Sequence, residues 1–238
     1  MPAADPRVAD LRRDGRIRFG LFPSFFYSKN SATGELQGVG VGIARELAAR
    51  IGATLVLREY ANPPAVVQAL AAGEIDVATL GLDPARATQV DFSPPYMKAD
   101  FSFLVPQDSA VRSVADANTA GRRIAMVRNH AMDRALKDNG AERIYADTPD
   151  AAFDLLRASQ ADVLAGIRPG LMRYAAQLPG ARVLDDHYGA NILALAVAKG
   201  HAERLAFVSE FVTQARASGL VQRTIDAAGL RGIDVVTA

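Results

Sequence analysis

The stretch that decides the fold is Ala69–Tyr96, ALAAGEIDVATLGLDPARATQVDFSPPY. It predicts the end of a helix, a turn at Gly73, a buried strand over Ile75–Leu80 and a loop that carries Arg86. Open α/β sheets place ligand-binding groups just past the carboxyl ends of such strands. The five donors of a guanidinium suit a carboxylate or a phosphate, so Arg86 is a candidate anion-binding residue. The alternative is an ordinary surface arginine.

Helices and strands alternate on the amino-terminal side of this stretch. Strands are predicted at Arg16–Phe22 and Thr54–Tyr60, and helices run from Ile43 to Gly52 and onward from Pro63. The glycine-rich run Gly38–Gly42 does not fit the dinucleotide pattern G-x-G-x-x-G. Alternating strands and helices predict a parallel sheet covered by helices on both faces.

A second cycle of strands and helices follows a polar connector over Gln107–Ala120. Leu70, Ala72, Asp76 and Val77 match Leu156, Ala158, Asp162 and Val163 at one constant offset, which indicates two lobes of like construction. Later strands and helices are predicted at Phe101–Val105, Arg122–Val127, His130–Asn139, Arg143–Ala146, Thr148–Ala158, Asp162–Ile167 and Asn191–Ala198, before two final helices. We expect one lobe over residues 1–103 plus 193–238, a second over 104–192, and a ligand cleft and hinge between them.

Composition excludes several classes of function. The 238 residues carry a net charge of +1, which gives no argument for nucleic acid or membrane binding. There is no cysteine, and the three histidines lie far apart, so neither a metal nor another cofactor is expected. The start at Met1–Asp5 lacks a basic region followed by an apolar run, so we expect no signal peptide in this sequence. A periplasmic location is expected, or a cytoplasmic one if the native start is Met1.

The motifs resemble a known family. GELQGVGVGIARELAARIG, the Ala69–Tyr96 block, GRRIAMVRNH and SQADVLAGI are similar to extracellular solute-binding proteins of ABC importers, in the group for polar amino acids and related small solutes. The resemblance spans about Arg16 to Gly229 and is most specific in the pattern from Asp83 through Asp91 to Tyr96. It implies a two-lobed α/β fold of the type II periplasmic binding protein kind, which closes on its ligand, works as a monomer and delivers the ligand to a membrane permease.

The resemblance also implies roles for single residues. In this family the arginine that matches Arg86 binds the carboxylate of the ligand, helped by the preceding loop. A second contact comes from the helix start in the second lobe, and an aromatic side chain of the first loop stacks on the ligand. The candidate ligand-binding residues are therefore Arg86, Asp83, Gly81, Phe25, Tyr27, Arg128, Asn129, His130, Arg168 and Asn191.

Arg168 stands where amino acid binders carry an aspartate for the α-ammonium group. If it points into the cleft, a small organic anion fits better than an amino acid, unless Asp83 replaces the missing acceptor. One alternative is an enzyme on the same scaffold, similar to cyclohexadienyl dehydratase, in which His130 and Asp83 are the candidate acid–base residues. Another is a cytosolic ligand-sensing module.

Overall fold

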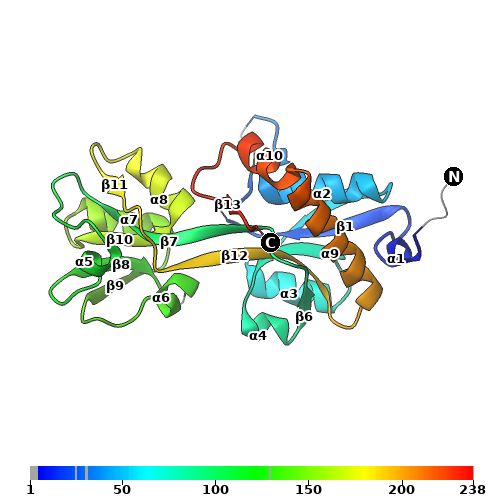
Figure 1. The fold of residues 1–238 in the computed structure, drawn as a ribbon, viewed down its shortest axis with the longest axis horizontal. Helices are drawn as coiled ribbons and strands as arrows, with labels where there is room; N and C mark the ends of the chain where they lie inside the picture. The colour runs from blue at the N-terminus through cyan, green and yellow to red at the C-terminus, as the bar shows by residue number, and fades with distance from the viewer. Residues whose placement is uncertain (1–4, 25, 30–31, 129, 238) are drawn as a thin grey trace. The chain divides into compact units, whose positions relative to one another are not determined.

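The chain divides into two compact units in a computed structural model that describes all residues except 1–4, 25, 30–31, 129 and 238. Unit 1 comprises Met1–Lys98, Ile192–Leu230 and Asp234–Ala238, and unit 2 comprises Ala99–Asn191 and Arg231–Ile233. Figure 1 shows the helices and strands of both units along the chain. The predicted α/β class is confirmed, whereas the predicted limits of the lobes stay a prediction.

Unit 1 contains three parallel strands extended by antiparallel ones. The strands β1 (Arg16–Leu21), β4 (Thr54–Glu59) and β5 (Val77–Gly81) are parallel, with β1 in the middle. β12 (Gly189–Ala198) pairs antiparallel with β5, and β6 (Val90–Phe92) pairs with β12. Because β1 and β5 are parallel, their carboxyl ends meet at one edge of the sheet.

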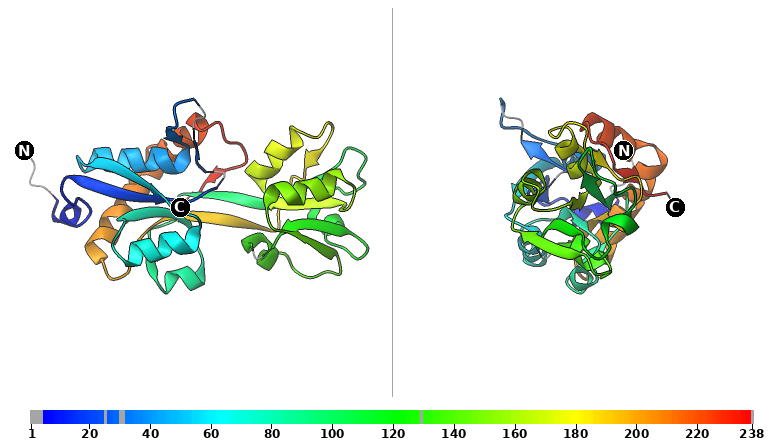
Figure 2. Two further views of the ribbon diagram at one scale, coloured as in Figure 1. Left: turned by 180° about the vertical axis from the view of Figure 1, so that it is seen from behind. Right: turned by 90° about the vertical axis from the view of Figure 1, so that its left-hand side faces the viewer.

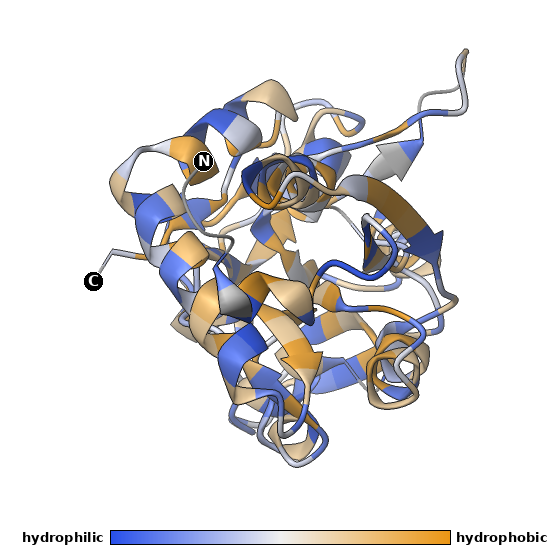
Figure 3. Ribbon diagram, turned by 90° about the vertical axis from the view of Figure 1, so that its right-hand side faces the viewer, coloured by the Kyte–Doolittle hydropathy of each residue, from blue (hydrophilic) through white to orange (hydrophobic). Residues whose placement is uncertain are grey.

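Helices cover both faces of this sheet. The helices α2 (Val39–Arg50) and α10 (Leu220–Ala227) lie on one side, and α3 (Pro63–Ala71) lies on the other (Figures 1 and 2). α9 (Ala202–Ala217) packs against α10 and against the short α1 (Pro6–Ala9). In Figure 3 the helices carry both hydrophobic and hydrophilic residues, as expected for elements with one buried face. A two-stranded sheet joins β2 (Ser28–Lys29) to β3 (Leu36–Gln37).

Unit 2 has the same arrangement of three parallel strands extended by an antiparallel strand. Its parallel strands are β8 (Arg123–Val127), β9 (Glu142–Ala146) and β10 (Val163–Ile167), and β7 (Met97–Val105) pairs antiparallel with β10. β11 (Arg182–Val183) pairs with β7. The helices are α5 (Val114–Ala117), α6 (Ala131–Ala135), α7 (Pro149–Arg157) and α8 (Arg168–Ala175). Phe153 of α7 and Tyr174 of α8 stack at 4.4 Å in the core of the unit. The last strand, β13 (Asp234–Val235), belongs to unit 1, where it pairs with the first residues of β7, Met97 and Lys98.

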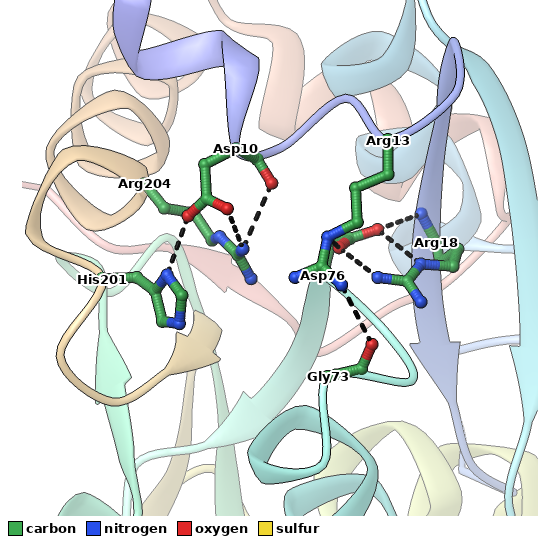
Figure 4. Close-up of polar contacts among 7 residues, drawn as sticks. All are labelled: Asp10, Arg13, Arg18, Gly73, Asp76, His201 and Arg204. Carbon is green, nitrogen blue, oxygen red and sulfur yellow. Dashed lines mark hydrogen bonds and ion pairs between the residues drawn. The ribbon is translucent and has the colours of Figure 1, made fainter.

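The internal repeat seen in the sequence corresponds to one hydrogen-bonding arrangement. Asp76 accepts the backbone N–H of Arg18 at 2.8 Å and its Nη2 at 2.7 Å, and Asp76 N–H donates to Arg18 O (Figure 4). In unit 2, Asp162 accepts Arg123 N–H at 2.9 Å and Nη2 at 2.8 Å, with the same return bond. The two aspartates therefore tie the start of the third strand to the first strand in each unit.

The structure corrects three predicted elements. Arg86 lies not in a loop but in the one-turn helix α4 (Pro84–Ala87). The predicted helix His130–Asn139 is the shorter α6 (Ala131–Ala135). α2 begins at Val39 rather than Ile43, after Gly38 with φ +123°. A Cβ on Gly42 would lie 2.9 Å from Thr224 Cγ2 of α10, so close packing of two helices explains a glycine inside this one.

Candidate functional site

Arg86 is held at the carboxyl end of β5. The Asp83 carboxylate caps α4 by accepting the backbone N–H groups of Ala85 at 2.9 Å and Arg86 at 3.3 Å. Arg86 Nη1 donates to the carbonyl of Gly81, the last residue of β5, at 2.9 Å. The structure therefore brings Gly81, Asp83 and Arg86 together, as the sequence predicted for a group at a strand end.

A pocket of unit 1 opens at the same edge of the sheet. Its lining residues come from the end of β1 and the following loop, from α2, from β5 and from β12: Leu21, Phe22, Ser24, Phe26, Tyr27, Gly40, Thr79 and Leu193. Leu193 pairs with Gly81 in the ladder between β12 and β5, which connects the pocket to the residue that holds Arg86. Tyr27 lines this pocket, while Phe25 lies outside the described residues.

The hydroxyl groups around this pocket already have partners within unit 1. Tyr27 donates to Glu59 Oε1 at 3.2 Å, and burial, together with the nearby Glu59 carboxylate, raises the pKa of Tyr27. Thr79 Oγ1 and Tyr96 Oη are hydrogen-bonded at 2.9 Å, and complete burial raises the pKa of Tyr96 far above its ordinary value. The pocket therefore presents mainly apolar surface.

The predicted second contact region lies in unit 2, where Arg128 and His130 follow β8. Arg128 is exposed, donates to Asp147 at 3.1 Å and stacks over the Tyr145 ring at 5.7 Å. The side chain of His130 caps α6 by accepting Met132 N–H on Nδ1 at 3.3 Å, and its ring meets Phe101 edge-on at 6.3 Å. Asn129, between them, lies outside the described residues.

Arg168 is engaged inside its own unit. Its Nη1 donates to Leu184 O at 2.9 Å, its Nη2 donates to the carbonyls of Asp185 and Asp186 at 3.0 and 3.3 Å, and its Nε lies 4.0 Å from Asp100 Oδ2. With these contacts Arg168 fixes the segment before β12 and faces a carboxylate. The preference for an organic anion over an amino acid required Arg168 to point into the cleft, whereas here its guanidinium is bound to backbone carbonyls of unit 2.

Two features near these residues were not predicted. Asp100 in β7 lies close to both Arg168 and His187, with Oδ2 3.6 Å from His187 Nδ1. Tyr188 packs on Phe103 at 5.1 Å and on Phe101 at 6.0 Å, and burial raises its pKa. The alternation of Phe101 and Phe103 along β7 was the available sequence signal for this aromatic group. Asn191, the remaining candidate, lies in β12 at the last position of unit 2 before the chain re-enters unit 1.

Two kinds of site are not seen in the part of the chain that the structure describes. There, no group of three or more histidine, aspartate and glutamate side chains is arranged to hold a metal ion. No described helix is long and apolar enough to cross a membrane.

The family model for bacterial extracellular solute-binding proteins, family 3, matches residues 20–227. The chain belongs to this family. The match begins within β1 and includes Arg86, the other parallel strands of both units and all of α10, so the resemblance seen in the sequence motifs is confirmed.

Relatives of this solute-binding protein differ in how much of their own length the match covers. A glutamine-binding protein of Geobacillus stearothermophilus is 29% identical over 187 residues, which cover 74% of this chain and 69% of that protein. The virulence sensor protein BvgS of Bordetella bronchiseptica is also 29% identical, over 184 residues, but these cover 74% of this chain and only 15% of the sensor.

A solved structure supports the fold. An ancestral amino acid-binding protein, described as a precursor of cyclohexadienyl dehydratase, has a TM-score of 0.74 at 23% identity and covers 92% of this chain and 97% of its own. The two-lobed binding-protein fold is therefore shown, with two units in one chain.

Proposed function

We propose that this solute-binding protein is the substrate-binding component of an ABC importer and that it captures a small solute by its carboxylate. The observation that carries the proposal is the position of Arg86, fixed at the end of β5 by Gly81 O and by the turn that Asp83 caps. A guanidinium oriented by its own backbone contact loses little entropy when it binds a carboxylate in a fork geometry.

The remaining parts of the proposal follow from the family. A membrane permease as partner, a periplasmic location and closure of the two lobes on the ligand are proposed because relatives carry names such as ABC transporter glutamine-binding protein, from Bacillus subtilis. Since Arg168 is engaged within unit 2, we no longer favour organic anions over amino acids and propose any small carboxylate of either kind.

The test is ligand binding by the purified protein and three variants. Thermal shift and calorimetric titration against amino acids, keto acids, dicarboxylates and aromatic acids identify a ligand, because binding to the folded state alone raises its stability. Arg86→Ala is expected to weaken binding by about 100-fold or more, because it removes a charge-assisted contact of ~3 kcal/mol. The affinity of Arg86→Lys is expected to lie between those of the wild type and Arg86→Ala.

Arg12→Ala is the matched control, since Arg12 is an exposed arginine of the same unit. It is expected to leave affinity unchanged, and all three variants are expected to keep the unfolding midpoint of the unliganded protein within a few degrees. Undiminished affinity in Arg86→Ala would show that the carboxylate is bound elsewhere.

A second candidate function is a sensory domain, and the match to BvgS is the observation that favours it. Both functions begin with capture of a solute and differ in what receives the signal. Deletion of the gene separates them. For an importer component, uptake of the radiolabelled solute stops, whereas for a sensor uptake continues and solute-dependent gene expression is lost.

A further inference from the structure

We propose that unit 1 carries a second binding site, for a small organic monoanion with an apolar body, in the groove between α2, α9 and α10. The site is independent of Arg86 and of carboxylate capture at the end of β5. Its evidence is the size of the groove, the two arginines that line it and the partners of those arginines.

The groove has the size of a small-ligand site. The three helices that form it pack together, since α10 contacts both α2 and α9 (Figure 1). Its volume is about 390 Å³, within the range of roughly 300–1,000 Å³ that ligand pockets occupy. Phe211 and Ala215 of α9 line it and are buried, Leu220 at the start of α10 is half-buried, and Ala49 of α2 is exposed. An apolar body placed there removes its own surface from water together with the part of theirs that is still exposed.

Three charged side chains line the groove, and two of them are arginines. Arg50 ends α2, Arg223 lies near the start of α10, and Glu46 lies one turn before Arg50. Among the residues that the structure describes, no ion pair within 4.0 Å joins either arginine to a carboxylate. By contrast, Arg45 on the same helix pairs with Glu35. Two arginines against one glutamate leave the groove with an excess of one positive charge, which an anion can neutralise.

Both guanidinium groups are held in place by neutral acceptors. Arg50 and Glu46 lie at i and i+4 of one helix, a spacing at which such side chains commonly pair. Arg50 Nη2 donates instead to Gln214 Oε1 of α9. Arg223 Nη1 donates to Ser218 O at 2.8 Å. Each contact orients a guanidinium without neutralising it, so both charges are offered to a bound anion.

The carboxylates at the groove limit the anion to a single charge. Glu46 lines the groove and repels a second negative charge on the ligand. Glu210, which accepts from Gln214 Nε2 at 2.9 Å, already pairs with Arg7 at 2.8 Å. One negative charge balances the excess positive charge, whereas a second one would lose water without gaining a partner.

The groove lies apart from the Arg86 end of the sheet. One end of α2 carries Gly40, which lines the small pocket at that edge, and the other end carries Arg50. At 1.5 Å per residue, the two positions are about 15 Å apart along the helix. Binding at the two places can therefore be measured separately.

The experiment is an NMR titration of isotope-labelled protein with benzoate, benzamide and acetate, followed by the backbone amide shifts. Benzamide has the ring without the charge, and acetate has the charge without the ring. The titration is run on the wild type and on Arg86→Ala, so that a carboxylate bound at Arg86 cannot account for the signal. Benzoate is expected to shift the amides of residues 46–50 and 214–223 in both proteins. It is expected to bind there about threefold or more tightly than benzamide or acetate.

Four variants test the charges assigned to the groove. Arg50→Ala and Arg223→Ala are each expected to weaken benzoate binding about threefold or more, because each removes one exposed positive charge. Glu46→Gln removes the repelling carboxylate and is expected to tighten it about twofold or more. Arg45→Ala is the matched control, since Arg45 lies on the same helix outside the groove and is expected to leave the affinity unchanged. All four side chains are exposed, so the variants are expected to keep the fold.

Three outcomes would overturn this site: benzamide binding as tightly as benzoate, weaker benzoate binding in Glu46→Gln, or no shift of the groove amides at about 10 mM benzoate. Failure of the proposed function has a different pattern. Groove shifts that persist in Arg86→Ala, in a protein whose solute affinity does not depend on Arg86, would leave this site standing and overturn carboxylate capture. Shifts confined to residues 79–86 that vanish in Arg86→Ala would do the reverse.

Discussion

Arg204 in α9 is completely buried, and its guanidinium forms an ion pair with Asp10. The Nη2 atom lies 2.9 Å from Asp10 Oδ1 and 3.1 Å from Asp10 O (Figure 4). Nε and Nη1 are buried and have no hydrogen-bond partner among the residues that the structure describes. His201 Nδ1 lies 2.7 Å from Asp10 Oδ2. The Asp10 carboxylate, on the amino-terminal segment, thus compensates the charge of Arg204 in α9.

Asp10→Asn is expected to lower the free energy of unfolding by about 1–3 kcal/mol, because it leaves the buried charge of Arg204 uncompensated, although water screens part of the pair at the half-exposed Asp10 side chain. Urea denaturation measures the change. Asp154→Asn removes an exposed carboxylate whose nearest cation, Arg157, lies 3.6 Å away, and it is expected to cost less than about 1 kcal/mol. Equal losses in the two variants would contradict a special role for Asp10.

The same pair predicts the acid dependence of stability. Burial favours the neutral form of Asp10, but hydrogen bonds from Arg204 and His201 outweigh burial and hold the pKa of Asp10 below its ordinary value. A pKa lowered by folding contributes stability above the unfolded value of about 4, and this contribution is lost as the pH falls through the folded value. Below about pH 4 the wild type is therefore expected to lose stability more steeply than Asp10→Asn.

At the scale of single elements, α2 shows how a contact between helices overrides local preference. Three glycines at its amino-terminal end argue against a helix in the sequence, and the helix nevertheless starts at Val39. Gly42→Ala is expected to cost about 1–3 kcal/mol, because the added methyl group meets Thr224 Cγ2 at 2.9 Å.

The double variant Gly42→Ala/Thr224→Ser supplies the control. Serine lacks that methyl group and keeps the hydroxyl, which donates to Val221 O at 2.7 Å. Measured against Thr224→Ser alone, Gly42→Ala is then expected to lose most of its cost, because only the 3.3 Å contact with Cβ of residue 224 remains and alanine is favoured over glycine in a helix interior. An equal cost in both backgrounds would show that the close approach of α10 is not the reason for the glycine.

Other elements show what the sequence could and could not predict. Strands such as β5 and β10 were predicted because they are continuous apolar runs, and Thr148–Pro149 gave a clear helix start. α4 was missed because a single turn that begins at a proline looks like a loop. The place of Arg86 at a strand end could be predicted, but the contacts of Arg168 could not, because its partners are backbone carbonyls of residues 184–186.

At the scale of the whole molecule, each unit has its own core. The core of unit 1 contains Leu70 of α3, and the core of unit 2 contains Leu156 of α7, the residue that matches it in the internal repeat. Both side chains are nearly or fully buried, at 0% and 3% exposed. A unit with a core of its own can lose its structure while the other keeps it.

Leu70→Ala and Leu156→Ala are therefore expected to act on different halves of the chain. Each removes buried methyl groups and is expected to cost about 2–5 kcal/mol. In hydrogen exchange followed by mass spectrometry, Leu156→Ala is expected to lower protection in β8, β9 and β10 while β1 and β5 stay protected, and Leu70→Ala is expected to do the reverse. Because the two variants are matched in chemistry and in repeat position, a uniform loss of protection in either one would mean that the units unfold as a single cooperative block.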